Sequence, residues 1–283
     1  MYVSCFFVTI KRVKTLNGSE LVDFIKERQA KQVRGLRQAE RIVPRLAIVR
    51  CDRANPVIDT YVRLKKRYGE DILIEVDEYL ESPETVEVCL KQLTSDELVH
   101  GIIVQLPVEP ADLTEVLLQL VPPQKDVDGL ARQSHFDAAT PMAINWLLVG
   151  YGIDPKAHTI AVVGEGRLVG GPLVKMWRAS GVDVTVFRKE DAARLESALP
   201  AYSLIVSATG VAHSITSAMV RPKAVVVDAG TSSEDGVIKG DVAEDVRARE
   251  DVTITPEKGG VGPLTVAALF DNVIRAARAT VQK

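Results

Sequence analysis

The segment Thr-Ile-Ala-Val-Val-Gly-Glu-Gly-Arg-Leu-Val-Gly-Gly-Pro, at residues 159–172, decides the fold class of this chain. An apolar β-type run ends in a glycine-rich turn, and a helical stretch follows. This order is typical of dinucleotide binding, because glycines let the backbone approach a pyrophosphate and a helix N-terminus offers oriented N–H groups. The glycine spacing is GxGxxxG instead of the commoner GxGxxG. Taken alone, this motif could therefore also be a tight turn that binds no ligand.

Similar apolar runs recur along the chain, with helix-length segments between them. Continuous Val- and Ile-rich strands separated by helices indicate parallel sheets that are covered on both faces. The expected strands are 46–49, 72–76, 101–106, 159–163, 182–187, 204–208 and 224–228. The expected helices are 21–41, 57–68, 83–93, 141–150, 170–180 and 264–281. The strands fall into two groups on either side of 137–152, which predicts an α/β protein with two lobes: a βαβ domain, then a Rossmann-like domain.

Composition excludes several classes of function. The chain has 283 residues, of which 46% are hydrophobic and 26% charged, and its net charge is −3. This charge gives no basis for binding nucleic acid or a membrane surface, which require concentrated positive charge. Cys5, Cys51 and Cys89 are far apart and form no CxxC pair, so we expect a reducing, cytoplasmic setting without disulfides or zinc. We assign no function to residues 1–14. The apolar run 1–10 is too short to span a bilayer.

Small residues follow other expected strands of the second lobe and would let a ribose or nicotinamide lie across the sheet edge. Arg188 and Lys189 end the strand 182–187, where the 2′-phosphate of NADP would lie, although a solvated strand end explains them equally well. The candidate cofactor-binding residues are Gly164, Glu165, Gly166, Val169, Gly170, Arg188, Lys189, Ala208, Thr209, Gly210 and Thr231.

Tyr61 and Lys65 are spaced by four in an expected helix and therefore share one face. A phenol and an ammonium that face a cleft can act as a general acid–base unit, because burial lowers the lysine pKa toward neutrality. Many helices carry this spacing by chance. Gln105 ends an apolar strand, where an amide is costly without partners. We expect it to line the cleft, the alternative being that it caps the next loop.

Two further loops contain residue types that suit a ligand. Asp126 and Asp128 are two residues apart, but no ligand set for a metal accompanies them, so we predict no metal site. A carboxylate can instead accept two N–H bonds from an aminopyrimidine ring, such as a pterin. The glycines at 259–262 indicate either crowding against a ligand or turns with positive φ. Pro263 fits the first position of the last helix.

The segments 101–107, 125–130 and 258–265, in this order, resemble the methylenetetrahydrofolate dehydrogenase/cyclohydrolase family, and the resemblance runs from about Leu16 to the C-terminus. It implies oxidation of 5,10-methylenetetrahydrofolate with NAD(P)+ and hydrolysis of the methenyl product to 10-formyltetrahydrofolate. This chemistry belongs to one-carbon metabolism and supplies purine biosynthesis. The resemblance also implies a cytoplasmic homodimer whose small-molecule substrates are tetrahydrofolate derivatives.

The resemblance further implies a role for each candidate catalytic residue. Lys65 becomes the central acid–base group, Tyr61 its neighbour over the folate, Gln105 the partner that positions the lysine, and Asp128 the pterin anchor. The last helix packs back on the first lobe. The expected domains are therefore 1–138 plus 264–283 for catalysis and folate binding, and 139–263 for NAD(P). The implied substrate-binding residues are Tyr61, Val104, Gln105, Leu106, Asp128, Gly262 and Pro263.

This chain departs from the family pattern at several positions. Glu165 stands where an Arg usually helps to hold the 2′-phosphate, so NADP is favoured but NAD stays possible. Ile58 replaces a Ser, and the loop 50–55 is about two residues longer, which leaves a monofunctional dehydrogenase as an alternative. Lys258 replaces a Pro, and 136–141 lacks the usual Pro-Cys. A two-lobed shikimate or amino-acid dehydrogenase and a non-catalytic folate-binding protein are further alternatives.

Overall fold

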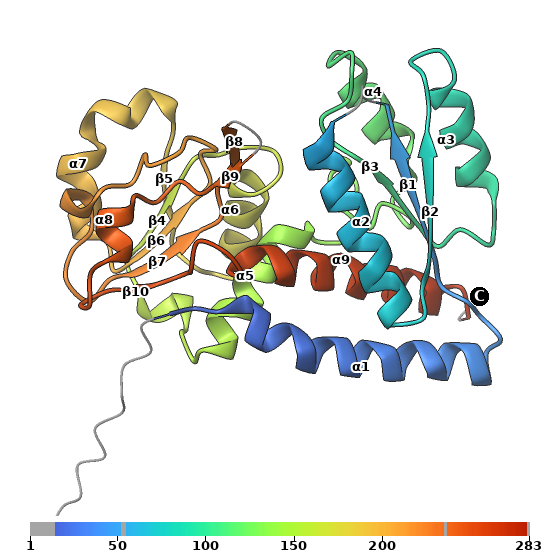
Figure 1. The fold of residues 1–283 in the computed structure, drawn as a ribbon, viewed down its shortest axis with the longest axis horizontal. Helices are drawn as coiled ribbons and strands as arrows, with labels where there is room; N and C mark the ends of the chain where they lie inside the picture. Colours follow the sequence, from blue (N-terminus) through green and yellow to red (C-terminus); the bar gives the residue numbers. More distant parts are fainter. Residues whose placement is uncertain (1–14, 52–54, 235–236, 282–283) are drawn as a thin grey trace, which may run out of the picture.

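The computed structural model describes residues 15–51, 55–234 and 237–281, so our expectations for residues 1–14 and for the inserted loop residues 52–54 lie outside it. Figure 1 shows two lobes, each built on its own sheet, with long helices running beneath them. The predicted two-lobed α/β architecture is confirmed. No helix in the described ranges is both long and apolar enough to cross a membrane.

The first lobe contains a parallel sheet with the strand order β2-β1-β3. Its strands are β1 (Arg45–Arg50), β2 (Glu75–Leu80) and β3 (Gly101–Val104). Successive residues of β1 face opposite sides: Leu46 and Ile48 join one buried core, and Ala47 and Val49 join another. Helix α2 (Pro56–Asp71) covers the first side, and α3 (Val86–Ser95) and α4 (Leu113–Leu120) cover the second.

The second lobe contains a parallel five-stranded sheet with the order β10-β7-β6-β4-β5. The chain starts this sheet at β4 and places later strands on both sides of it, so the order reverses between β4 and β6. Ligands of doubly wound sheets bind at the carboxyl ends of strands at such a point. The strands are β4 (Ile160–Val163), β5 (Thr185–Phe187), β6 (Leu204–Ser207), β7 (Val225–Asp228) and β10 (Thr253–Ile254).

Short elements complete the second lobe. The helix α6 (Gly170–Ala179) follows the glycine turn, and β8 (Ser232–Glu234) and β9 (Val237–Lys239) form an antiparallel hairpin. The remaining helices are α7 (Leu195–Ala198), α8 (Glu244–Arg247) and the 3-10 turns Pro155–Ala157, Lys189–Arg194, Leu199–Ala201 and Ser217–Met219.

Three helices contribute to both lobes: α1 (Gly18–Ala39), α5 (Ala139–Gly150) and α9 (Val261–Ala279). The first turns of α9 bury Val261 and Leu264 in the core of the second lobe, whereas its later turns bury Phe270 and Val273 in the core of the first. The last helix thus packs back on the first lobe, as predicted (Figure 1). Leu16, just before α1, is buried in the second lobe. The domain limits stay a prediction, because these segments belong to both cores.

Several elements differ from the sequence-based expectation. The start of the strand expected at 72–76 was wrong. Ile72 and Ile74 are buried on either side of an exposed turn residue, Leu73, which has φ 65°, and β2 begins at Glu75. β2 is a polar edge strand, so it lacks the apolar run of a central strand. Pro263 is the third residue of α9, not the first. The elements α4, α7, α8, β8, β9 and β10 were not predicted.

The GxGxxxG turn requires two of its glycines for different reasons. Gly164 has φ 93°, in the left-handed region that disfavours side chains. A Cβ at Gly170 would lie 1.8 Å from the carbonyl oxygen of Gly164, so the start of α6 packs directly on the turn. A Cβ at Gly166 would meet no atom within 4 Å. The turn is therefore held by close backbone packing at its two ends.

Replacing Gly170 with Ala should destabilise the protein by roughly 1–3 kcal/mol, because the added methyl group displaces the backbone of the turn. Gly166→Ala is the matched control and should change the free energy of unfolding by less than about 0.5 kcal/mol. Urea unfolding followed by circular dichroism measures both. Equal stability of the two variants would contradict the packing described for Gly170.

Candidate active site

A cleft of about 480 Å³ lies between the two lobes. The first lobe contributes Tyr61, Lys65, Gln105, Leu106 and Asp128 to its lining, and the second contributes Val169, Asp228, Gly230 and Thr231. Gly262 and Pro263 at the start of α9 close one side. The structure therefore brings together, in one cavity, most of the residues predicted for substrate binding and catalysis. Val104 is the exception, because it is buried in the core behind the cleft.

Lys65 and Gln105 are joined by a hydrogen bond. The ammonium Nζ of Lys65 donates to the Gln105 Oε1 over 2.6 Å, and the Gln105 Nε2 donates to the carbonyl of Leu106. Gln105 is fixed in turn by its backbone N–H, which continues the pairing of β3 by donating to the carbonyl of Val49. The predicted pairing of amide and lysine is present, and both groups of the Gln105 amide are used.

Helix α2 places Tyr61 and Lys65 because its start is well defined. The Asn55 side chain accepts hydrogen bonds from the backbone N–H groups of Val57 and Ile58, and Pro56 occupies the first helical position. Ile58 is 2% exposed and packs into the core of the first lobe. The helix therefore buries Ile58 against the sheet while Tyr61 and Lys65 line the cleft.

The cleft changes the acidity of the groups that line it. Burial lowers the pKa of the Lys65 ammonium, and the nearby Asp128 carboxylate acts in the opposite direction. Burial raises the pKa of the Asp128 carboxyl, which Lys65 counteracts, and burial also raises the pKa of the Tyr61 phenol. Lys65 therefore releases its proton more readily than a lysine in water, as a group that must both take up and give back a proton requires.

The two acids of the loop after α4 have different environments. Asp126 is buried, and its carboxylate accepts hydrogen bonds from the backbone of Leu130 and Ala131. Asp128 lines the cleft, and no hydrogen-bond donor within the described residues is bonded to its carboxylate. Asp126 thus shapes the loop, and Asp128 presents its oxygens to a ligand. The described residues contain no group of three or more His, Cys, Asp or Glu that could hold a metal ion.

The predicted cofactor residues follow the carboxyl ends of three neighbouring strands. Gly164, Glu165 and Gly166 follow β4, Ala208, Thr209 and Gly210 follow β6, and Arg188 and Lys189 follow β5. Of the predicted set, Val169 and Thr231 line the cleft and the others lie outside its lining. A dinucleotide lying along this edge would extend from the cleft across the glycine turn to β5. The residues predicted to bind the cofactor thus follow the carboxyl ends of the strands, the edge where doubly wound sheets bind their ligands.

Two acids at the end of β7 and after β9 were missed by the sequence analysis. Asp241 is fully buried, and its Oδ2 accepts hydrogen bonds from the Ser207 hydroxyl over 2.7 Å and from the Thr209 N–H over 2.6 Å. Asp228 accepts from the N–H groups of Asp241 and Val242 and pairs with Arg247. These bonds fix the ends of β6 and β7 beside the cleft. Their only sequence signal was that each acid lies within two residues of a glycine.

The loop 259–263 is anchored by the start of α1, from the opposite end of the chain. The Ser19 N–H, at the start of α1, donates to the carbonyl of Gly259 over 3.0 Å. A Cβ at Gly18 would lie 2.0 Å from the carbonyl oxygen of Gly260, so the two segments cross with no room for a side chain. Gly259 itself has φ 82°. A positive φ therefore explains Gly259, whereas a Cβ at Gly262 would meet no protein atom within 4 Å, so crowding against a ligand stays a prediction for that position.

Comparison with known proteins identifies the family of this chain. Residues 138–281 match the family model of the tetrahydrofolate dehydrogenase/cyclohydrolase NAD(P)-binding domain, and residues 16–128 match the model of the catalytic domain. The bifunctional protein FolD of a Nitratiruptor species is 32% identical over 94% of this chain and 98% of its own length.

Two solved structures resemble the whole fold. The bifunctional FolD methylenetetrahydrofolate dehydrogenase/cyclohydrolase of Campylobacter jejuni has a TM-score of 0.87 at 30% identity, covering 95% of this chain and all of its own. The Trypanosoma brucei dehydrogenase-cyclohydrolase, solved with NADP and an inhibitor, has a TM-score of 0.87 at 25% identity and covers 96% of this chain and 99% of its own. This chain therefore belongs to the tetrahydrofolate dehydrogenase/cyclohydrolase family.

Proposed function

We propose that this protein oxidises 5,10-methylenetetrahydrofolate to the 5,10-methenyl compound with NADP+ and hydrolyses that product to 10-formyltetrahydrofolate. The observation that carries the proposal is the single cleft that joins Lys65, Gln105 and Asp128 of one lobe to the nucleotide edge of the other. Both reactions need the same pterin in the same place, so one cleft serves both. Membership of this family argues against the shikimate and amino-acid dehydrogenase alternatives.

The dehydrogenase step depends on orientation. The nicotinamide ring supplies a hydride acceptor, and Val169, Gly230 and Thr231 line the side of the cleft where it would lie. The glycine turn fits a dinucleotide, because its packing leaves no side chain between the start of α6 and the ends of β4 and β6. Residues of both lobes line the cleft, so they would hold the donor and acceptor carbons near contact, which would provide a large part of the rate advantage.

The hydrolytic step needs a group that moves protons. We assign this role to Lys65: in its neutral form it accepts a proton from the water that adds to the methenyl carbon. The bond between that carbon and N5 then breaks: the added hydroxyl loses its remaining proton to solvent as it becomes the formyl carbonyl, and Lys65 returns its proton to the departing nitrogen. The lowered pKa of Lys65 makes the neutral form accessible, and the hydrogen bond to Gln105 keeps its Nζ aimed into the cleft.

The pterin is held by Asp128 and Tyr61 in this proposal. The Asp128 carboxylate has no hydrogen-bond donor among the described residues and can accept two N–H bonds from the aminopyrimidine ring. Tyr61 lies one helical turn before Lys65 and lines the same wall, where its ring can cover the pterin face. Leu106, Gly262 and Pro263 supply apolar contacts around the substrate.

Three further assignments extend the proposal beyond the site. We propose a homodimer formed through the second lobe, a cytoplasmic location and a contribution to purine biosynthesis. The support for these is the family membership. Sedimentation analysis of the purified chain measures the first of them.

Replacing Lys65 with Met should lower methenyl hydrolysis by about a hundredfold or more, because the general acid–base group is lost. The fold should survive, since Lys65 lines a cleft and is not part of a buried core. Lys66→Met is the matched control, because Lys66 pairs with Glu78 outside the cleft and should be dispensable for hydrolysis. The two activities are followed separately, by the absorbance of the reduced cofactor and of the methenyl compound. Undiminished hydrolysis in Lys65→Met would contradict the assignment.

Replacing Asp128 with Ala should raise the KM for methylenetetrahydrofolate by about 10- to 100-fold, since hydrogen bonds to a charged group are lost. The KM for NADP+ should stay within about twofold, because the cofactor binds the other lobe. Steady-state kinetics with each substrate varied in turn measures both. An unchanged folate KM would remove Asp128 from the pterin site.

Replacing Asp128 with Asn should also lower the pKa of Lys65 further, because the Asp128 carboxylate raises it in the unchanged protein. An NMR titration of ¹³C-labelled lysine side chains measures this pKa without substrate. Glu257→Gln removes another cleft carboxylate and should leave the Lys65 titration where it is. A Lys65 pKa that rises or stays constant in Asp128→Asn would show that the two groups do not interact as described.

A further inference from the structure

An ion pair joins the glycine turn to the end of the neighbouring strand β5. The Glu165 Oε2 lies 2.5 Å from the Arg188 Nε, at side-chain exposures of 31% and 56%. The backbone fixes this meeting, because Val163 and Phe187 are paired in the sheet and the Gly164 N–H donates to the carbonyl of Phe187. Both side chains thus leave the sheet at the same point.

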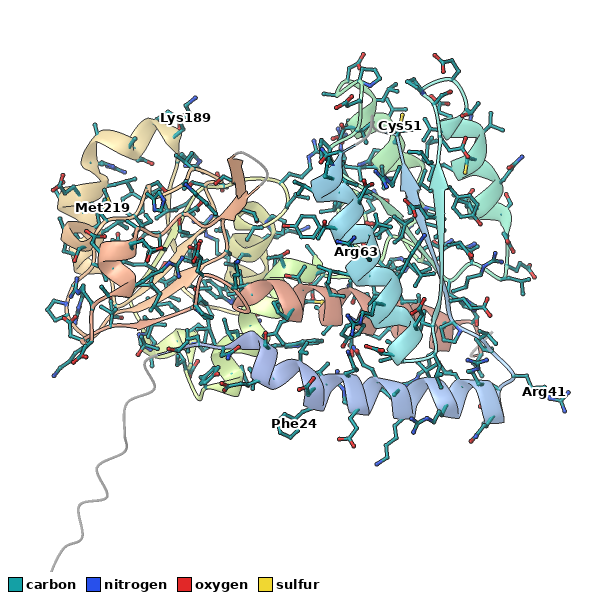
Figure 2. All side chains as sticks on the ribbon, in the orientation of Figure 1. Phe24, Arg41, Cys51, Arg63, Lys189 and Met219 are labelled. Atoms are coloured by element: carbon teal, nitrogen blue, oxygen red, sulfur yellow. The ribbon has the colours of Figure 1, made fainter. Side chains whose placement is uncertain are left out.

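This point is where the adenosine ribose of a dinucleotide lies in a doubly wound sheet. A carboxylate at this point accepts a hydrogen bond from the free 2′-hydroxyl of NAD. An arginine at this point binds the 2′-phosphate of NADP. This chain holds one group of each kind, bonded to each other. Lys189, the next cation along the chain, lies at the outer edge of the lobe and points away from it (Figure 2).

We propose that Glu165 is a specificity-determining residue that narrows the preference of this protein for NADP over NAD. The inference rests on the proposed dehydrogenase function and concerns only which nicotinamide cofactor that function takes. The Glu165 carboxylate is bonded to the Arg188 guanidinium, to which a 2′-phosphate would otherwise bind. NADP must therefore displace the carboxylate from Arg188, whereas NAD can leave the pair intact and donate its 2′-hydroxyl to Glu165.

The strength of the pair sets the size of the effect. Exposed ion pairs contribute little free energy, because solvent and salt screen them, so a phosphate can replace the carboxylate. The displaced carboxylate stays close to the phosphate, and the two negative charges repel each other. Glu165 therefore reduces NADP binding without preventing it, and NAD binding is retained. A chain with a neutral residue at 165 would discriminate more strongly.

Glu165→Gln tests this directly, since it removes the charge and keeps the size of the side chain. Binding of NADPH and NADH is measured on the full chain by fluorescence titration, so the result does not depend on turnover. The NADPH dissociation constant should fall about tenfold relative to that of NADH, and this gain should shrink as salt is raised. Arg188→Met should have the opposite effect and weaken NADPH binding more than NADH binding.

Glu190→Gln is the matched control, because Glu190 lies two residues from Arg188 and no hydrogen bond or ion pair joins the two among the described residues. Its NADPH-to-NADH affinity ratio should stay within about twofold of the unchanged protein. A ratio that does not move in Glu165→Gln, or that moves equally in Glu190→Gln, would overturn the inference while leaving the proposed function standing. Failure of both dinucleotides to bind the unchanged protein would overturn the proposed function as well.

Discussion

The packing of α9 into two hydrophobic cores is the constraint on which the cleft depends. Val261 and Leu264 are held by the second lobe, and Phe270 and Val273 by the first, so one rigid helix connects both sheets. The cleft is lined by the start of this same helix. The burial of apolar side chains on α9 therefore sets the distance across the cleft, from Lys65 in the first lobe to Val169 and Thr231 in the second. Neither lobe could be displaced far without exposing part of this shared core.

The chemistry of the site follows from what the cleft does to charge. A lysine near an amide and a carboxylate loses water on burial, and its pKa falls, while the carboxylate keeps it from falling as far. An apolar wall alone would lower the pKa of Lys65 further and make its amine too weak a base to accept a proton from water. A fully paired lysine would hold its proton too firmly. The combination of burial, a neutral hydrogen-bond acceptor and one nearby anion suits a group that must both accept and donate a proton.

Features that depend only on residues close together in the sequence could be predicted from it. The glycine turn, the Tyr61–Lys65 spacing and most helices depend on neighbouring residues and could be predicted. The start of β2 could not, because Ile72 and Ile74 are apolar for packing around a turn and not for a strand. Asp241 was missed because its partners, Ser207 and Thr209, are more than thirty residues away in the chain. The roles of the site residues came from the family resemblance, and their placement in one cleft came from the structure.

A crystal structure of this protein with a tetrahydrofolate analogue and NADP+ tests the central claim most directly. The account predicts one pterin in the cleft between the lobes, bonded to the Asp128 carboxylate, with the Lys65 Nζ in hydrogen-bond reach of its reacting bridge. The nicotinamide should lie on the opposite side, with its reacting carbon about 3–3.5 Å from the carbon that gives up the hydride. A pterin bound elsewhere, or a Lys65 ammonium turned away from it, would contradict the account.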